Sequence, residues 1–410
     1  MTTALEETRH AGARVGTAPG YGWFLAGAGS WFGAWGMQSV LFSWLVVGEA
    51  QASAEWVGVL QTSTMLPTLG FLLMGGVTAD RYDPRSLLMR LYVLAALPVL
   101  ALALAVATDH LVLGGLFAYG LCIGTISSFT MPARDTLLSR VAGTDMMHAV
   151  TGTTATQFGA QAAGSLVAGA ARWIGSAPML VVQACLLLVG SVVTARVPSR
   201  PVDAPVHQSS SVLRDIQAGI VEVARTSQLR AALVLAMAVG LLFIGPFLVI
   251  YPLLVRDHYA GGVDRLSLVL MMFPLGTIIG SLLLRRLGGI QRKGRAALCS
   301  LATGACVMAS VGSGVAFWGL VLLTLFWGFN AAVFINCTRT LFQEAAPAKS
   351  RARVLSIYQL GFMGMAPVGA LVSGVLSGRI GPLETLLVFA GGMLTVVVLM
   401  AALTETLRME

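Results

Sequence analysis

Apolar and polar residues follow one another along the chain in long blocks, in which extended apolar stretches are separated by short polar connections. Most of the apolar stretches hold about 20 residues, enough for a helix to cross the ~30 Å hydrocarbon core of a bilayer. The pattern predicts about twelve spans, at 21–47, 55–79, 87–107, 111–133, 147–172, 178–197, 229–255, 265–284, 296–313, 316–338, 354–378 and 383–403. We therefore expect an all-α membrane protein.

The composition supports this expectation. Of the 410 residues, 56% are hydrophobic and 11% are charged, whereas an ordinary soluble domain is about 45–50% apolar and about 25% charged. So few charges cannot cover the surface of a water-soluble protein of this size. The composition therefore excludes a cytoplasmic or secreted globular enzyme.

Polar segments divide the chain into five parts. The first segment carries charges of both signs and lacks an apolar core after a basic start, so it is not a signal peptide. The parts are a cytoplasmic tail (1–20), a six-helix bundle (21–197), a cytoplasmic linker (198–228), a second six-helix bundle (229–404) and a cytoplasmic tail (405–410). Within the linker, the helical spacing of apolar residues from Val212 to Val223 fits an amphipathic helix on the inner face. A partly ordered linker explains the same residues equally well.

Basic residues are distributed unequally between the two sides of the membrane. With the N-terminus inside, 22 of the 26 Lys and Arg residues fall on the cytoplasmic side, as the positive-inside rule requires. The four that fall outside are Arg172, Arg256, Arg265 and Arg379. The net charge of +8 therefore reflects topology, and we expect no nucleic-acid partner. Both termini are predicted to be cytoplasmic.

An internal repeat appears when the sequence is compared with itself at an offset of 205 residues, half the length of the chain. The matching pairs include Gly159 with Gly364, Gly164 with Gly369, Gly75 with Gly280 and Arg134 with Arg339. The repeat predicts two pseudo-symmetric halves of six helices each. Transporters built from such parallel repeats bind their substrate near the bilayer midplane, between the halves.

A short charged turn, GVTADRYDPR from Gly76 to Arg85, joins the second and third predicted spans. It resembles the cytoplasmic loop signature of the major facilitator superfamily. The resemblance implies the superfamily's fold, and implies that Asp80 and Arg81 join an ion-pair network that latches the halves together in the outward-facing state. Solvated charges that only maintain the topology are the alternative. The residues assigned to this cytoplasmic gate are Gly76, Asp80, Arg81, Arg85, Arg134, Asp135, Arg339 and Glu344.

Other segments resemble the branch of the superfamily that contains the enterobactin exporter and related siderophore and drug efflux proteins. They are MPARDTLL at 131–138, FQE at 342–344 and RARVLS at 351–356. The resemblance implies proton-coupled export across a bacterial inner membrane. The chain departs from the pattern at Pro84, where the family usually has Arg, and at Ala160, where antiporters have Pro. The second departure weakens the assignment of antiport, although Pro367 keeps the proline in the eleventh span.

Acidic residues are placed away from the membrane interior: all 18 lie in termini, loops or span ends. A charge at the midplane costs roughly 2.5–3.5 kcal/mol, so such residues tend to mark ion pathways. The proton carrier therefore stays unassigned. Glu55 and Asp135, at span edges, are the candidates, and an interfacial or gate role is the alternative for both.

Neutral polar and aromatic side chains occupy the interior instead. Amides at membrane depth need partners, and aromatic rings offer broad contact surfaces, so a cavity lined by them suits a bulky, largely uncharged or aromatic solute. The predicted substrate-binding residues are Trp35, Gln38, Gln61, Gln157, Gln161, Phe247, Tyr251, Trp327, Asn330, Tyr358 and Phe362. Helix packing is the alternative role for each of them.

The sequence lacks a nucleophile and base set, a glycine-rich phosphate loop and metal-ligand spacing. We therefore expect neither an enzyme nor an ATP-driven pump, and no cofactor or metal. The prediction is a monomeric secondary transporter in the lipid bilayer that exports a small amphiphilic molecule, such as a siderophore or drug, with protons as the coupling ion. An importer of an iron chelate or metabolite is one alternative. A membrane sensor or scaffold that transports nothing is the other.

Overall fold

The computed structural model describes residues 20–143, 146–198, 220–286, 290, 292–345 and 351–403. These residues form helices and connections, without a strand among them. Most of the predicted tails and linker lie outside the described residues, at 1–19, 199–219 and 404–410. Residues 220–225 of the linker are helical, and Val223 is buried in a small cluster with Phe342 and Tyr358.

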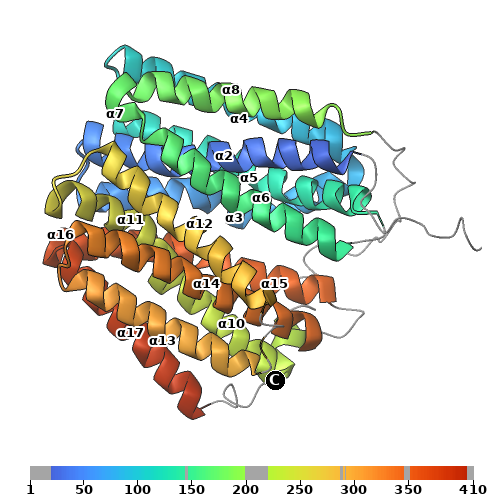
Figure 1. Cartoon of the computed structure of the whole chain (residues 1–410), viewed down its shortest axis with the longest axis vertical. Helices are drawn as coiled ribbons and strands as arrows, with labels where there is room; N and C mark the ends of the chain where they lie inside the picture. The colour runs from blue at the N-terminus through green and yellow to red at the C-terminus, as the bar shows by residue number, and fades with distance from the viewer. Residues whose placement is uncertain are drawn as a thin grey trace, which may run out of the picture.

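The first half of the chain forms one group of helices, drawn blue to green in Figure 1. Its elements are α2 (Tyr21–Trp44), the π-helical turn η1 (Leu45–Glu49), α3 (Ala54–Arg81), α4 (Pro84–Ala107), α5 (Leu113–Val141), α6 (Met146–Ala168), α7 (Ala171–Ile174) and α8 (Ser176–Thr194). Here α2 packs on α6 and α8, α3 on α5, and α4 on α8.

The second half forms the other group, drawn yellow-green to red in Figure 1. Its elements are α10 (Ser227–Val239), η2 (Gly240–Ile244), α11 (Gly245–Leu253), η3 (Leu254–His258), α12 (Val263–Arg286), α13 (Lys293–Gly312), α14 (Phe317–Ala345), α15 (Arg351–Gly364), α16 (Ala366–Ile380) and α17 (Pro382–Leu403). Here α12 packs on α14, α13 on α14 and α17, and α11 on α16.

Nine segments of the described chain are long and apolar enough to cross a membrane. Three further helices, α2, α3 and α6, hold 24, 28 and 23 residues, or about 35–42 Å at 1.5 Å per residue. With these three, twelve segments of the described residues are long enough to cross a bilayer. The predicted all-α membrane fold is confirmed.

The repeat seen in the sequence corresponds to equivalent helix contacts. Gly75 of α3 lies against the carbonyl oxygen of Ser128 on α5. Its partner in the repeat, Gly280 of α12, lies against α14, where an added Cβ would come within 2.7 Å of the carbonyl oxygen of Phe329. Because a side chain would separate the two helices, glycine permits the same close approach in each half.

Four predicted spans are interrupted in the structure. The first ends in the π-helical turn η1, and the fifth breaks at 169–170, between α6 and α7. The seventh contains the π-helical turns η2 and η3, each with one extra residue in the turn. The eleventh divides into α15 and α16 at Met365, directly before Ala366 and Pro367. Pro367 has no backbone N–H, and its ring conflicts with the carbonyl group of Met363 four residues earlier, which explains the break between α15 and α16.

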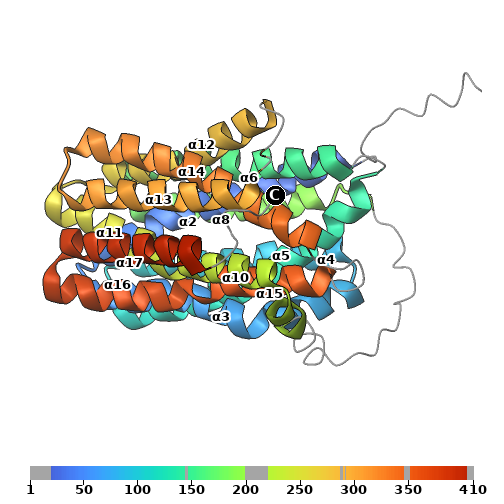
Figure 2. The same cartoon turned by 90° about the horizontal axis from the view of Figure 1, so that it is seen from below.

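The two groups of helices meet mainly at one end of the molecule. We call it the closed end; the connections 50–53, 169–170 and 259–262 lie there, while α2 begins and α8 ends at the opposite, terminal end (Figures 1 and 2). Between the groups, α3 packs on α16 and α6 on α12. An added Cβ at Gly58 of α3 would lie 2.7 Å from the carbonyl oxygen of Ala370 on α16. Within the described residues, hydrogen bonds between the groups occur only toward the closed end.

Candidate functional site

Five aromatic rings from three segments form a cluster inside the second half, which we call the aromatic cluster. Trp327 of α14 lies at its centre, with ring centroids 5.3 Å from Phe243, 5.5 Å from Phe247, and 5.7 Å from both Tyr251 and Phe273. Phe247 and Phe273 are half-buried, while the other three are buried. Such offset and edge-on contacts stabilise aromatic pairs. The cluster is therefore a rigid platform with two partly exposed rings.

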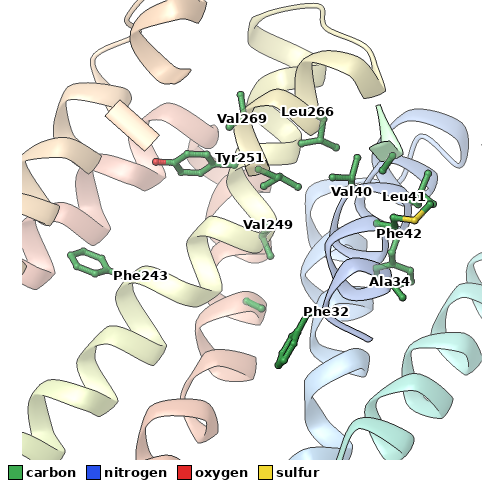
Figure 3. Packing of buried hydrophobic residues seen from close by; sticks show 14 of the residues in the cluster. Phe32, Ala34, Val40, Leu41, Phe42, Phe243, Val249, Tyr251, Leu266 and Val269 are labelled. Atoms are coloured by element: carbon green, nitrogen blue, oxygen red, sulfur yellow. The ribbon is translucent and has the colours of Figure 1, made fainter. Parts of the chain in front are cut away.

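The structure brings together three of the predicted substrate-binding residues in this cluster, namely Phe247, Tyr251 and Trp327. Phe273 of α12 is a member that the sequence analysis did not select. In Figure 3, Phe243 and Tyr251 lie along the same chain segment, and Phe32 of α2 lies on the facing half.

A second group of stacked side chains lies on α2. The Trp35 ring stacks on the Phe32 ring with centroids 6.3 Å apart and an interplanar angle of 19°. The guanidinium carbon of Arg134, on α5, lies 4.8 Å from the centroid of the Phe32 ring, a cation–π geometry. Trp35 is 36% exposed although α2 packs on α6, α8 and α5. Because α2 also packs on α12 of the second half, the exposed Trp35 ring belongs to a helix at the boundary between the halves.

Gln38 lies one turn from Trp35 and ties three helices of the first half together. Its Oε1 accepts a hydrogen bond from the Tyr119 hydroxyl on α5 and one from Gln183 Nε2 on α8, the latter at 3.0 Å. A buried amide network of this kind holds helices in one arrangement. Its contact with substrate stays a prediction.

Two other predicted residues make hydrogen bonds to helices. Gln61 of α3 is buried and donates from Nε2 to Ser43 Oγ at 3.0 Å. Asn330 of α14 is buried and donates from Nδ2 to the carbonyl oxygen of Phe326 at 2.9 Å. Each amide thus has one partner inside its own half.

Gln157 and Gln161 of α6 are half-buried. The carbonyl oxygen of Gln161 lies directly against Gly36, at the contact between α6 and α2. Gln157 lies one turn earlier on the same side of α6. The contact of these residues with substrate stays a prediction.

Tyr358 and Phe362 of α15 belong to a separate cluster near the terminal end. The Tyr358 hydroxyl lies 3.1 Å from Thr338 Oγ1, and its ring contacts Phe342 and Phe362 at 4.7 and 6.1 Å. Tyr358 is buried with Val223 and Phe342. Tyr358 thus lies in the smaller core cluster, whereas Phe362 packs against both this cluster and the main core that contains Trp327.

The charged turn after α3 is organised by Asp83. Its Oδ2 accepts from the Ser86 backbone N–H at 3.0 Å and so caps α4, while Oδ1 lies 3.6 Å from Arg140 of α5. Pro84 occupies the first position of α4, which suits a residue without an N–H. Arg85 donates to the carbonyl oxygen of Ala195. The turn thereby joins α4 to α5 and to the end of α8.

The other residues assigned to the cytoplasmic gate are less engaged. Arg81 and Arg339 are exposed, and an added Cβ at Gly76 would meet no atom within 4 Å. The side chains of Asp80 and Glu344 lie outside the described residues. Their participation in a gate stays a prediction.

Arg134 and Asp135 form an ion pair on α5. Both Nε and Nη2 of Arg134 donate to Asp135 Oδ1, at 3.2 and 3.0 Å. The side chain of Arg134 is only 8% exposed, whereas that of Asp135 is 65% exposed. Arg134 thus extends into the first half while its partner lies at the surface.

The closed end holds a set of contacts between the halves that the sequence analysis did not select. Arg256 of η3 donates from Nη1 to the carbonyl oxygens of Val47 and Ala52, at 2.9 and 3.0 Å. Arg172 donates from Nη1 to both carboxylate oxygens of Asp264, each at 3.0 Å. Both arginines belong to the four that fall outside in the positive-inside count. That exception to the charge pattern is the signal that could have indicated them.

Glu55 also lies at the closed end, in the first turn of α3. It is exposed, and its carboxylate lies against Gly378 of α16 on the other half. This position is at the contact between the halves, away from the aromatic cluster.

Comparisons with known proteins concern both the family and the fold. A model of the family described as transmembrane secretion effector matches residues 23–409. None of the curated proteins matches the chain. The structure of the nucleoside transporter NupG is similar with a TM-score of 0.75 and 14% identity, covering 94% of this chain and 98% of that one.

Two other solved structures have the same fold. A POT family transporter in complex with 5-aminolevulinic acid has a TM-score of 0.73 and 12% identity, covering 95% of this chain and 97% of that one. An auto-inhibited POT family peptide transporter has a TM-score of 0.69 and 14% identity, covering 93% and 96%. Identities this low show the fold alone. The family match spans nearly the whole chain, however, so the chain is a secondary transporter and belongs to the transmembrane secretion effector family of the major facilitator superfamily.

Proposed function

We propose that the transporter exports a small amphiphilic molecule by alternating access, taking it up at the terminal end and releasing it at the closed end. The observation that carries this proposal is the one-sided contact between the halves: Gly58 against Ala370, Thr62 to Pro367 and Arg172 with Asp264 all lie toward the closed end. A transporter in this arrangement receives cargo from the other end. The description of the family as secretion effectors favours the outward direction.

The terminal end is proposed to face the cytoplasm of a bacterium, with the protein in the inner membrane. The distribution of 22 of the 26 basic residues supports this orientation. The charged turn around Asp80 and Arg81 then lies on the cytoplasmic side. We propose that it latches the halves when the closed end opens.

The proposed cargo is a siderophore or a drug-like molecule with an aromatic part. The aromatic cluster around Trp327 and the exposed Trp35 ring provide flat apolar surfaces on the two halves, and such surfaces bind aromatic solutes without strict shape requirements. Protons are the proposed coupling ion. Of the two candidate carriers, Asp135 is bonded to a buried arginine, and Glu55 lies at the closed end.

Transport in everted membrane vesicles tests this function. With protons pumped inward, vesicles containing the wild-type chain should accumulate a fluorescent drug-like amphiphile, and a protonophore should abolish the accumulation. Accumulation that persists in the presence of the protonophore would contradict proton coupling but would still support export. Efflux of preloaded probe from such vesicles, without accumulation, would indicate import.

The substitution Asp80→Asn separates a transporter from a sensor or scaffold. We expect a large loss of turnover while the protein remains folded, because the latch residue is removed. Unchanged flux of the amphiphile in this variant, and equal flux in vesicles without the protein, would favour the non-transporting alternative.

A further inference from the structure

Arg134 is the one charged side chain that is buried among the described residues. It donates from Nε and Nη2 to Asp135, yet its third nitrogen, Nη1, is buried and has no hydrogen-bond partner among the residues that the structure describes. Buried cationic donors are normally paired, because an unpaired one loses its hydration without compensation. The first half of the transporter therefore holds a donor that lacks an acceptor.

The surrounding residues leave this charge incompletely neutralised. The neighbours of the guanidinium are aromatic: it lies over Phe32 and close to Tyr92, whose ring stacks on Trp31. Asp135, the only carboxylate bonded to it within the described residues, is largely exposed to the outside of the bundle. The interior of the first half is consequently electropositive at Nη1.

The charge also lies deep in the bundle. Phe32 is the twelfth residue of α2, which places it roughly 17 Å from the start of the helix at 1.5 Å per residue. The guanidinium of Arg134 therefore lies beside the middle of α2, inside the first half. The Phe32 ring stacks on the ring of Trp35, which is exposed.

The repeated position in the other half is different. Arg339, the counterpart of Arg134, is exposed on α14, and the interior of the second half presents the aromatic cluster around Trp327. The two halves thus offer a cation on one side and flat apolar rings on the other.

We propose that Nη1 of Arg134 binds an anionic group of the cargo, while Trp35 and Phe32 stack on its aromatic part. The inference rests on the proposed function and narrows its cargo to aromatic anions, such as aryl carboxylates. Phe32 covers the guanidinium, so its side chain turns aside when the anion enters. The unpaired donor gains a charge-assisted hydrogen bond, and export of an anion is favoured by a membrane potential that is negative inside.

Binding to the full-length protein in nanodiscs tests the proposal, with 1-naphthoate and its neutral isostere 1-naphthamide as probes in equilibrium dialysis. Wild type should bind naphthoate at least tenfold more tightly than naphthamide. Arg134→Gln should abolish this preference, because the affinity for naphthoate should fall at least tenfold while the affinity for naphthamide changes less than twofold. Arg90→Gln, which removes an exposed arginine of α4, is the control and should bind both probes as wild type does.

Two further variants exclude misfolding as the cause. Trp35→Leu should lower the affinity for both probes to a similar extent, so that the preference for the anion remains. Should Arg134→Gln fail to give a monodisperse protein, Arg134→Gln with Asp135→Asn removes both charges of the pair and should likewise bind the two probes equally.

The inference stands only if wild type binds 1-naphthoate more tightly than 1-naphthamide and Arg134→Gln does not. Equal binding of the two probes by wild type, or a preference that survives in Arg134→Gln, would overturn it. Continued vesicle export of a neutral amphiphile in that case would leave the proposed function intact, whereas absence of transport of any amphiphile by wild type would remove the function itself.

Discussion

Arg256 donates a hydrogen bond to the carbonyl oxygen of Val47 at 2.9 Å, and the two residues occupy the same position in the two halves. Each is the third residue of a five-residue π-helical turn, η1 in the first half and η3 in the second. Each turn is followed by a non-glycine residue with positive φ, Gln51 at 46° and Ala260 at 44°. The repeated turns therefore meet at the closed end, where an arginine in one copy bonds to the backbone of the other.

Removal of this arginine should open the closed end. Arg256→Ala deletes the bonds to Val47 and Ala52, and hydrogen bonds to charged groups contribute about 1.5–3 kcal/mol each when well shielded. Because Arg256 is partly solvated, we expect a shift of roughly tenfold, about 1.4 kcal/mol, toward the state open at that end. Double electron–electron resonance measures the change as a longer distance between spin labels at positions 53 and 379.

Arg265→Ala is the control for this substitution. Arg265 lies at the same end and also donates to a carbonyl oxygen, but its partner, Tyr259, belongs to its own half. Its removal should leave the distance distribution unchanged. A shift of equal size in both variants would show that the loss of positive charge, and not the bond between the halves, determines the state.

The contact between α3 and α16 gives a second prediction. Gly58 lies so close to α16 that an added Cβ would be 2.7 Å from the Ala370 oxygen and 3.1 Å from the Gly374 Cα. A leucine there must push the halves apart at the closed end. We expect Gly58→Leu to populate the open state and to lower turnover at least tenfold, as measured by vesicle transport and by the same spin-label distance.

Gly70→Leu provides the matched control on the same helix. An added Cβ at Gly70 meets no atom within 4 Å, so the change in helix propensity is similar but the steric conflict is absent. Transport close to wild type is expected. An equal loss of transport in both variants would show that a leucine anywhere in α3 causes the defect, and that the contact with α16 does not.

The fold was predictable from the sequence because a lipid environment leaves the backbone few choices. Spanning segments must be helical to satisfy their own hydrogen bonds, so long apolar stretches located the helices. The repeat also predicted equivalent packing, as Gly75 and Gly280 show. The π-helical turns were not predictable, because they depend on contacts such as that of Gly240 with the Phe362 carbonyl oxygen on a distant helix.

The site was only partly predictable, because the sequence does not show which faces of different helices contact one another. Phe247 and Tyr251 share one helix face and could be found together, and Trp327 was identified as an interior aromatic. The position of Arg134 over Phe32 was not predictable from its place near the end of a span. Long helical side chains point back along the helix toward its N-terminus, which carries this guanidinium into the bundle.

Phe247 offers a test of the aromatic cluster. Its ring is half-buried and contacts Tyr251, Phe273 and Trp327 at 4.9, 5.2 and 5.5 Å. Aromatic contacts contribute about 0.5–1.5 kcal/mol beyond burial, so Phe247→Leu should weaken cargo binding about two- to tenfold. Equilibrium dialysis with 1-naphthamide measures it. Phe326→Leu, which alters a 46% exposed ring on α14, should bind as wild type, and equal weakening in both would exclude the cluster as the binding surface.

Tyr358 distinguishes a structural residue from a substrate-binding one. Its hydroxyl pairs with Thr338 in a buried cluster away from Trp327, so Tyr358→Phe should lower the free energy of unfolding by about 0.5–1.5 kcal/mol, the net contribution of one hydrogen bond. Thr338→Val also removes the bond from Thr338 Oγ1 to the Phe334 carbonyl oxygen at 2.7 Å, so thermal unfolding should show at least the same loss for it. Adding Tyr358→Phe to Thr338→Val should cause no further loss, because the bond between the two hydroxyls is already absent. Affinity for 1-naphthamide should stay within twofold of wild type. A fivefold weaker affinity with unchanged unfolding would instead place Tyr358 in the substrate site, as its sequence position predicts.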